Sequence, residues 1–182
     1  MDHTPASPPC LVLGIETQIG VGVIRELGRA GIPVIGLANH ESAIGLASRH
    51  LQRGIVVGFQ RNEQLLQRLN ALGEELGDSV MLAIAESDIA WLLQHKSKLG
   101  RIRVVTPPEQ AFLDVLDKSR TLALAKQQGI RVPQSLQCTS LAQWREAAGQ
   151  LTYPVVVKWA DPLSAAPKLN AAGLHLHKLE YA

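Results

Sequence analysis

The feature that most limits the fold of this chain is a regular alternation of short apolar runs with amphipathic segments. The run Cys10–Ile15 has no charged residue, which is typical of a parallel strand covered on both faces. Segment 19–30 then places its aliphatic residues on one helical face and ends before Gly31. The alternation continues with expected strands at 32–38, 54–58, 79–85 and 101–106, and expected helices at 42–50, 62–76 and 87–99. This pattern predicts an α/β fold, a Rossmann-like doubly wound parallel sheet over residues 10–116.

After Pro107-Pro108 the alternation stops. We expect helices at 109–116, 117–128, 141–151 and 165–172, an edge-like strand at 132–138, a buried strand at 154–159 and a strand at 176–181. Two or three strands with few helices bury too little apolar surface to make a complete domain. We therefore interpret residues 117–182 as a truncated, incomplete α+β domain, and the Pro- and Ser-containing residues 1–9 as a disordered lead-in.

Charge and composition exclude several classes of protein. The net charge is +2 and the basic residues are scattered, so we expect no nucleic-acid partner. Every apolar run is interrupted by Gly, Pro or charge, so we expect no membrane span, and the start of the chain does not resemble a signal peptide. Cys10 and Cys138 form neither a disulfide framework nor a metal cluster. We expect a cytoplasmic protein.

Glycines follow the first strand, at the edge where doubly wound sheets bind ligands. Gly14, Gly20 and Gly22 lie around the expected start of a helix, and Gly14 and Thr17 are weak candidates for substrate contact. Their spacing is not the Gly-x-Gly-x-x-Gly of a dinucleotide site, and Asn39 stands where such a site has an acidic residue. We prefer the interpretation that these small residues let the helix pack closely on the strand.

Acidic residues follow the fourth strand at the same edge. Ser87 or Asp88 is best explained as a helix cap, and Glu86 and Asp88 are weak candidates for substrate contact. The histidines are dispersed, and although His175 and His177 fall on one strand face, no nearby Cys or carboxylate completes a metal set. We assign no catalytic and no metal-binding residue in this chain.

Two lysines remain. Lys158 ends the apolar run Tyr153–Lys158, where a lone lysine usually extends its ammonium to water. Lys118 opens an expected helix. Phosphoryl transfer needs positive charge on several phosphate oxygens at once, which two lysines from separate elements would supply if they met in one cleft.

In order and approximate spacing, the step Asp117-Lys118, the turn 129–133 and the strand 153–158 resemble the ATP-grasp superfamily. Segments 25–34 and 47–49 resemble its carboxylate–amine ligase-like branch. This resemblance implies a complete pre-ATP-grasp domain followed by the N-terminal part of the ATP-grasp domain.

The resemblance also implies a chemistry. Lys118 and Lys158 would bind the phosphates of ATP, with Mg²⁺ as the second cofactor. A small carboxylate would be activated as an acyl phosphate and attacked by an amine or a thiol. The Mg²⁺ ligands and the catalytic arginine are expected beyond the C-terminus of this chain, so we expect it to be inactive alone. Pre-ATP-grasp domains often pair, which makes a homodimer one expected assembly.

One departure from the family pattern concerns segment 159–167. Family members carry a glycine-rich flexible loop after the lysine strand, and this segment has no glycine. Two alternatives stay open at this point: an NAD(P)-binding Rossmann module of an oxidoreductase, and a non-catalytic module for ligand binding or assembly.

Overall fold

The computed structural model describes residues 7–174 and 180–181. Contacts divide the chain into two compact units, Met1–Thr106 and Pro107–Ala182. Most of the expected lead-in lies outside the described residues. The division precedes the predicted domain boundary at 116/117, because helix α4 (Glu109–Leu116) packs on helix α5 (Lys118–Gln127). The boundary itself stays a prediction.

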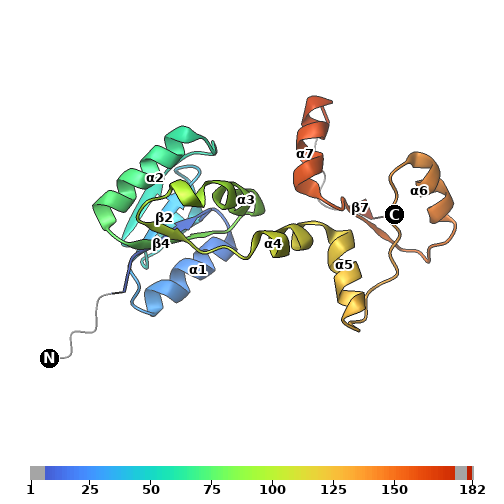
Figure 1. Ribbon diagram of the computed structural model, residues 1–182, viewed down its shortest axis with the longest axis horizontal. Coiled ribbons are helices and arrows are strands. Elements are labelled where there is room, and N and C mark those ends of the chain that lie inside the picture. The colour runs from blue at the N-terminus through green and yellow to red at the C-terminus, as the bar shows by residue number, and fades with distance from the viewer. Residues whose placement is uncertain (1–6, 175–179, 182) are drawn as a thin grey trace. The chain divides into compact units, whose positions relative to one another are not determined.

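The first unit contains a five-stranded sheet in which all strands are parallel, as the alternation predicted (Figure 1). The strands are β1 (Cys10–Leu13), β2 (Val34–Ala38), β3 (Arg53–Val56), β4 (Ser79–Ala83) and β5 (Ile102–Val104). Their order is β3-β2-β1-β4-β5. Leu11 of β1 pairs with Ile35 of β2 and Met81 of β4. The chain therefore builds outward from β1 in one direction and then in the other, and the topology switches between β1 and β4.

Helices cover both faces of this sheet, which explains why its strands are apolar without alternation. They are α1 (Gln18–Arg29), α2 (Glu63–Leu76) and α3 (Glu86–His95), with the 3₁₀ turn η2 (Lys96–Lys98) following α3. Ile24 of α1 shares one apolar cluster with Val12, whereas Leu69 of α2 and Leu92 of α3 share the other with Leu11. Neighbouring residues of β1 thus enter opposite layers of the core.

The expected helix at 42–50 is wrong except for one 3₁₀ turn, η1 (Ile44–Ala47). Gly45 N donates a hydrogen bond to Ile15 O at 3.0 Å instead of to a helical carbonyl. A Cβ on Gly45 would lie 2.5 Å from that oxygen. This contact between distant segments takes the N–H that an α-helix would need, and the sequence periodicity gave no sign of it.

The second unit has little core. Its elements, besides α4 and α5, are α6 (Leu141–Ala148), α7 (Pro162–Ala171), and β6 (Val156–Val157), which pairs antiparallel with β7 (Glu180–Tyr181). Among the described residues of this unit, Phe112 is the one buried hydrophobic side chain. Asp117 and Ser140 cap α5 and α6, in agreement with the expected helix starts.

Several expectations for this unit were wrong. The expected strand 132–138 has no regular structure. The expected buried strand 154–159 is reduced to Val156 and Val157, which are 50% and 40% exposed. β-branched residues favour a strand, but burial needs a second layer, and the described part of this unit does not provide one over β6. The helix expected at 165–172 begins earlier, because Asp161 caps it and Pro162 suits its first position. Most of the strand expected at 176–181 lies outside the described residues.

Candidate functional site

The carboxyl ends of the parallel strands bring four connecting segments of the first unit together. The turn at Gly14 follows β1, Asn39 follows β2, Arg61 follows β3, and Asp88 lies in the first turn of α3 after β4. This is the edge at which doubly wound sheets bind ligands.

The glycines after β1 serve close packing. Gly14 has φ +93°, a conformation that favours glycine. Thr17 caps α1, and its Oγ1 accepts a hydrogen bond from Gly20 N at 3.3 Å. A Cβ on Gly20 would lie 2.8 Å from both Gly14 O and Ile15 Cα, whereas one on Gly22 would meet nothing within 4 Å. The contact at Gly20 agrees with the packing interpretation preferred from the sequence. Substrate contact by Gly14 or Thr17 stays a prediction.

Asp88 does not cap helix α3, and this part of the sequence interpretation was wrong. The N-cap is Ala85, without a side-chain hydrogen bond, and Glu86 and Asp88 both lie in the first turn. Asp88 forms an ion pair with Arg61, with 2.6 Å between Oδ1 and Nε, and the two side chains are 4% and 14% exposed. A cap would leave the carboxylate at the helix end, whereas here an arginine from another segment holds it inside the protein. Substrate contact by Glu86 or Asp88 is not tested by these contacts.

The sequence analysis missed Arg61. Each of its three guanidinium nitrogens donates a hydrogen bond: Nε to Asp88, one terminal nitrogen to Gly58 O at 2.8 Å, and the other to Asn39 Oδ1 at 2.7 Å. Asn39 N also donates to Glu16 Oε1. Arg61 therefore joins the segments that follow β2, β3 and β4. The signal available in the sequence was an arginine in a loop at the same sheet edge as an acidic residue.

In the second unit, the two predicted lysines lie on segments that touch. Lys118 N donates a hydrogen bond to Ala160 O at 3.0 Å, and Ala160 comes two residues after Lys158. Lys118 is half-buried and Lys158 is exposed. The start of α5 is thus fixed against the chain that leaves β6. Binding of phosphate by either ammonium group stays a prediction.

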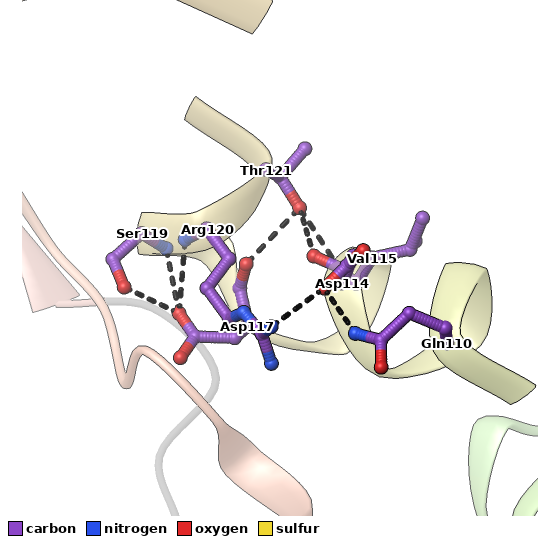
Figure 2. A network of polar contacts seen from close by, with 7 residues as sticks. All are labelled: Gln110, Asp114, Val115, Asp117, Ser119, Arg120 and Thr121. Atoms are coloured by element: carbon purple, nitrogen blue, oxygen red, sulfur yellow. Dashed lines mark hydrogen bonds and ion pairs between the residues drawn. The ribbon is translucent and has the colours of Figure 1, made fainter. Parts of the chain in front are cut away.

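A polar network joins helices α4 and α5 at the corner between them (Figure 2). Asp114 Oδ1 accepts from Gln110 Nε2 at 2.9 Å and pairs with a terminal nitrogen of Arg120 at 3.0 Å. Thr121 Oγ1 donates to Asp114 O at 2.9 Å. Asp114 of α4 is therefore bonded to residues of both helices, and these bonds fix the direction of α5 relative to α4.

The N-terminus of α5 has no free backbone donor. Asp117 Oδ1 accepts from Ser119 N at 2.8 Å, from Arg120 N at 3.3 Å and from Ser119 Oγ at 2.5 Å. Thr121 N donates to Asp117 O at 2.9 Å, and Lys118 N is taken by the chain after β6. The Ser119 hydroxyl, helped by these N–H groups, lowers the pKa of Asp117. An anion at this helix end would thus meet no unpaired N–H group of the first turn.

Helix α7 covers residues 162–167 of the glycine-free stretch 159–167. It begins at Pro162, and Asp161 caps it by accepting from Ser164 N at 3.1 Å and from the Ser164 hydroxyl. That hydroxyl lowers the pKa of Asp161, whereas burial and the negative charge of Asp117 oppose the shift. The segment after β6 is therefore largely helical.

The described residues contain no group of three or more His, Cys, Asp or Glu side chains placed to hold a metal ion. His175 and His177 lie outside the described residues. The chain as described thus offers no ligand set for Mg²⁺, and the expectation that such ligands lie beyond Ala182 stays a prediction. In the same residues, no helix is both long and apolar enough to cross a membrane.

No protein-family model and no curated protein sequence matches the chain. Solved structures do. N5-carboxyaminoimidazole synthetase from Staphylococcus aureus, complexed with ADP, is 18% identical with a TM-score of 0.61, over 88% of this chain and 40% of that one. The biotin carboxylase domain of Hydrogenobacter thermophilus 2-oxoglutarate carboxylase, a dimer with MgADP and bicarbonate, is 18% identical with a TM-score of 0.59, over 83% and 34%.

The L-amino acid ligase from Bacillus licheniformis is 14% identical with a TM-score of 0.57, over 93% of this chain and 43% of that one. The chain therefore spans about 40% of the length of these structures. The chain thus has an α/β fold. This fold matches that of the N-terminal part of the ATP-grasp ligases, as the resemblance implied.

Proposed function

We propose that this chain is the N-terminal portion of an ATP-dependent ligase that joins a carboxylate to an amine or a thiol. The fold supports this function, because enzymes of this class with ADP or MgADP bound share it. The observation that carries the proposal is the hydrogen bond between Lys118 N and Ala160 O, which brings together the two lysine-bearing segments of the motif.

In the proposed reaction, a carboxylate oxygen of the substrate attacks the γ-phosphorus of ATP, and the bond from that phosphorus to the β,γ-bridging oxygen breaks. ADP leaves and an acyl phosphate forms. The amine nitrogen then attacks the acyl carbon, phosphate leaves, and a proton is released from nitrogen. Lys118 and Lys158 would neutralise negative charge on the phosphates during the first step. Mg²⁺ would add to this neutralisation, but the described residues provide no ligand set for it, and we assign it no step.

Nucleotide binding tests the proposal. We expect ATP to shift the NMR signals of the backbone N–H groups of Lys118 and Trp159. In the full-length protein, Lys158→Ala should weaken ATP binding by roughly 10- to 100-fold, the effect of losing about 1.5–3 kcal/mol in a charged hydrogen bond. Lys126→Ala is the matched control, because this lysine is exposed like Lys158 but lies in the last turn of α5, at the opposite end of the helix from Lys118.

Equal ATP affinity in Lys158→Ala and the parent would remove Lys158 from the site. The 182-residue chain alone should release no ADP from ATP in the presence of carboxylates and amines. ADP release above the background rate would contradict the proposed division of the active site. The expected homodimer is checked separately, by light scattering of the eluting protein.

A non-catalytic binding or assembly module is the second candidate, and helix α7 favours it. A capped helix in place of a flexible loop makes closure over phosphates harder. The two candidates differ in turnover: a binding module would take up ATP in the full-length protein without ADP release. An NAD(P) module is disfavoured, because Asn39 follows β2 and the carboxylates of Glu16 and Asp88 face the Gly14 turn.

A further inference from the structure

The carboxylate of Asp88 lies against the turn where the topology of the sheet switches. Its Oδ2 is 3.6 Å from the place that a Cβ on Gly14 would occupy. Gly14 follows β1 and Asp88 follows β4, the two strands on either side of the switch point. In doubly wound sheets, phosphate-bearing ligands bind outside the strand ends at this point, beside the start of the first helix.

Arg61 holds this carboxylate in the way that an arginine holds a bound anion. Its Nε lies 2.6 Å from Asp88 Oδ1, and the two side chains are almost fully buried. The remaining guanidinium nitrogens donate to Gly58 O and Asn39 Oδ1. Three of the five guanidinium N–H groups are therefore engaged within the protein, and an incoming anion would compete with Asp88 for the positive charge of Arg61.

Glu16 adds a second negative charge. Its Oε2 is 3.8 Å from the same point beside Gly14, and its Oε1 accepts from Asn39 N. Two carboxylates and one guanidinium leave one net negative charge here. This balance opposes the approach of a further anion.

We propose that Asp88 is an internal anion that closes the switch point of the first unit to phosphate and carboxylate groups of ligands. Asp88 and Arg61 thereby determine which ligands this edge of the sheet excludes. The inference does not depend on the proposed ligase function, which places the phosphates of ATP on lysines of the second unit.

Inorganic pyrophosphate is the probe for this inference, and Asp88→Asn is the decisive variant. The amide keeps an oxygen that can accept from Arg61 Nε but removes the negative charge. All variants carry Lys118→Ala and Lys158→Ala, so that these lysines do not contribute. Binding is followed through the backbone N–H signals of Gly14 and Gly20. We expect Asp88→Asn to bind pyrophosphate at least about tenfold more tightly than this parent, so that the parent shows no saturable shift at concentrations that saturate the variant. The binding in Asp88→Asn should weaken as salt is added.

Glu75→Gln is the matched control, because it removes a carboxylate from an exposed ion pair with Arg53, 2.6 Å long, in the same unit. It should bind no more pyrophosphate than the parent. Adding Arg61→Gln to Asp88→Asn should abolish the gain. Circular dichroism melting shows which variants are folded.

If Asp88→Asn does not fold, Glu16→Gln replaces it, because that change leaves the ion pair intact, and a smaller gain is expected. Pyrophosphate binding at Gly14 in the parent with the affinity of Asp88→Asn would overturn the proposal. So would folded charge-removal variants that gain no binding.

Discussion

Gly20→Ala is the sharpest test of how the first helix meets the sheet. The new Cβ would lie 2.8 Å from Gly14 O and from Ile15 Cα. Both atoms belong to the backbone, so no side chain can rotate away, and α1 would have to move to restore an ordinary contact. Gly22, on the same helix, is the matched control because its Cβ would meet nothing within 4 Å.

The magnitude follows from two opposing terms. Replacing glycine by alanine inside a helix stabilises it by about 0.8–1.0 kcal/mol. Overpacking a close contact costs about 1–3 kcal/mol, and the upper half of that range applies where backbone meets backbone. Gly20→Ala should therefore lower the free energy of unfolding by about 1–2 kcal/mol. Gly22→Ala should raise it by up to about 1 kcal/mol.

Urea unfolding of the first unit measures this difference. Trp91 lies in α3 of that unit, and changing Trp144 and Trp159 to Phe leaves Trp91 as the sole tryptophan reporting the transition. The midpoint should shift in opposite directions for the two variants, with the slope of the transition unchanged. Equal midpoints for Gly20→Ala and Gly22→Ala would refute the packing interpretation.

Three further outcomes are expected. Arg61→Met should destabilise the first unit by about 3–5 kcal/mol in urea unfolding, because it leaves Asp88 buried without its partner; a loss below about 1 kcal/mol would contradict this. Burial raises the pKa of the Cys10 thiol to about 11, so in thiol titration at pH 8 Cys138 should react in the native protein and Cys10 only after unfolding. Hydrogen bonds lower the pKa of Asp117 in the folded state, so its stabilising contribution is present above the unfolded value and is lost as pH falls through the folded one. The stability difference between parent and Asp117→Asn should thus be present at pH 7 and shrink in acid, and a difference unchanged by pH would exclude this effect.

The local rules of the sequence predicted most of the first unit. Its apolar strand segments alternate with segments of helical periodicity. This pattern predicts a parallel sheet covered by helices on both faces. The caps at Asn62 and Ser140 were also predictable, because a side-chain oxygen at a helix start satisfies N–H groups close in sequence.

Expectations failed where a distant segment decided the outcome. The helix around Gly45 was lost to a hydrogen bond with Ile15 O, and the carboxylate of Asp88 went to Arg61 instead of capping its own helix. Neither partner can be identified from periodicity, because each contact depends on how separate strand ends come together.

The two units differ in how far the sequence alone determined them. It determined the strands of the first unit and the helices α1, α2 and α3, since these depend on neighbours within a few residues and on burial on both faces of a sheet. The sequence also carries Lys118 and Lys158 in the order in which they resemble the two lysines of the ATP-grasp motif. Only the tertiary structure decided that the segments carrying them touch, through Lys118 N and Ala160 O, and that Arg61 links the segments following three strands. Those contacts join residues far apart in the chain, and their geometry exists only once the elements have packed.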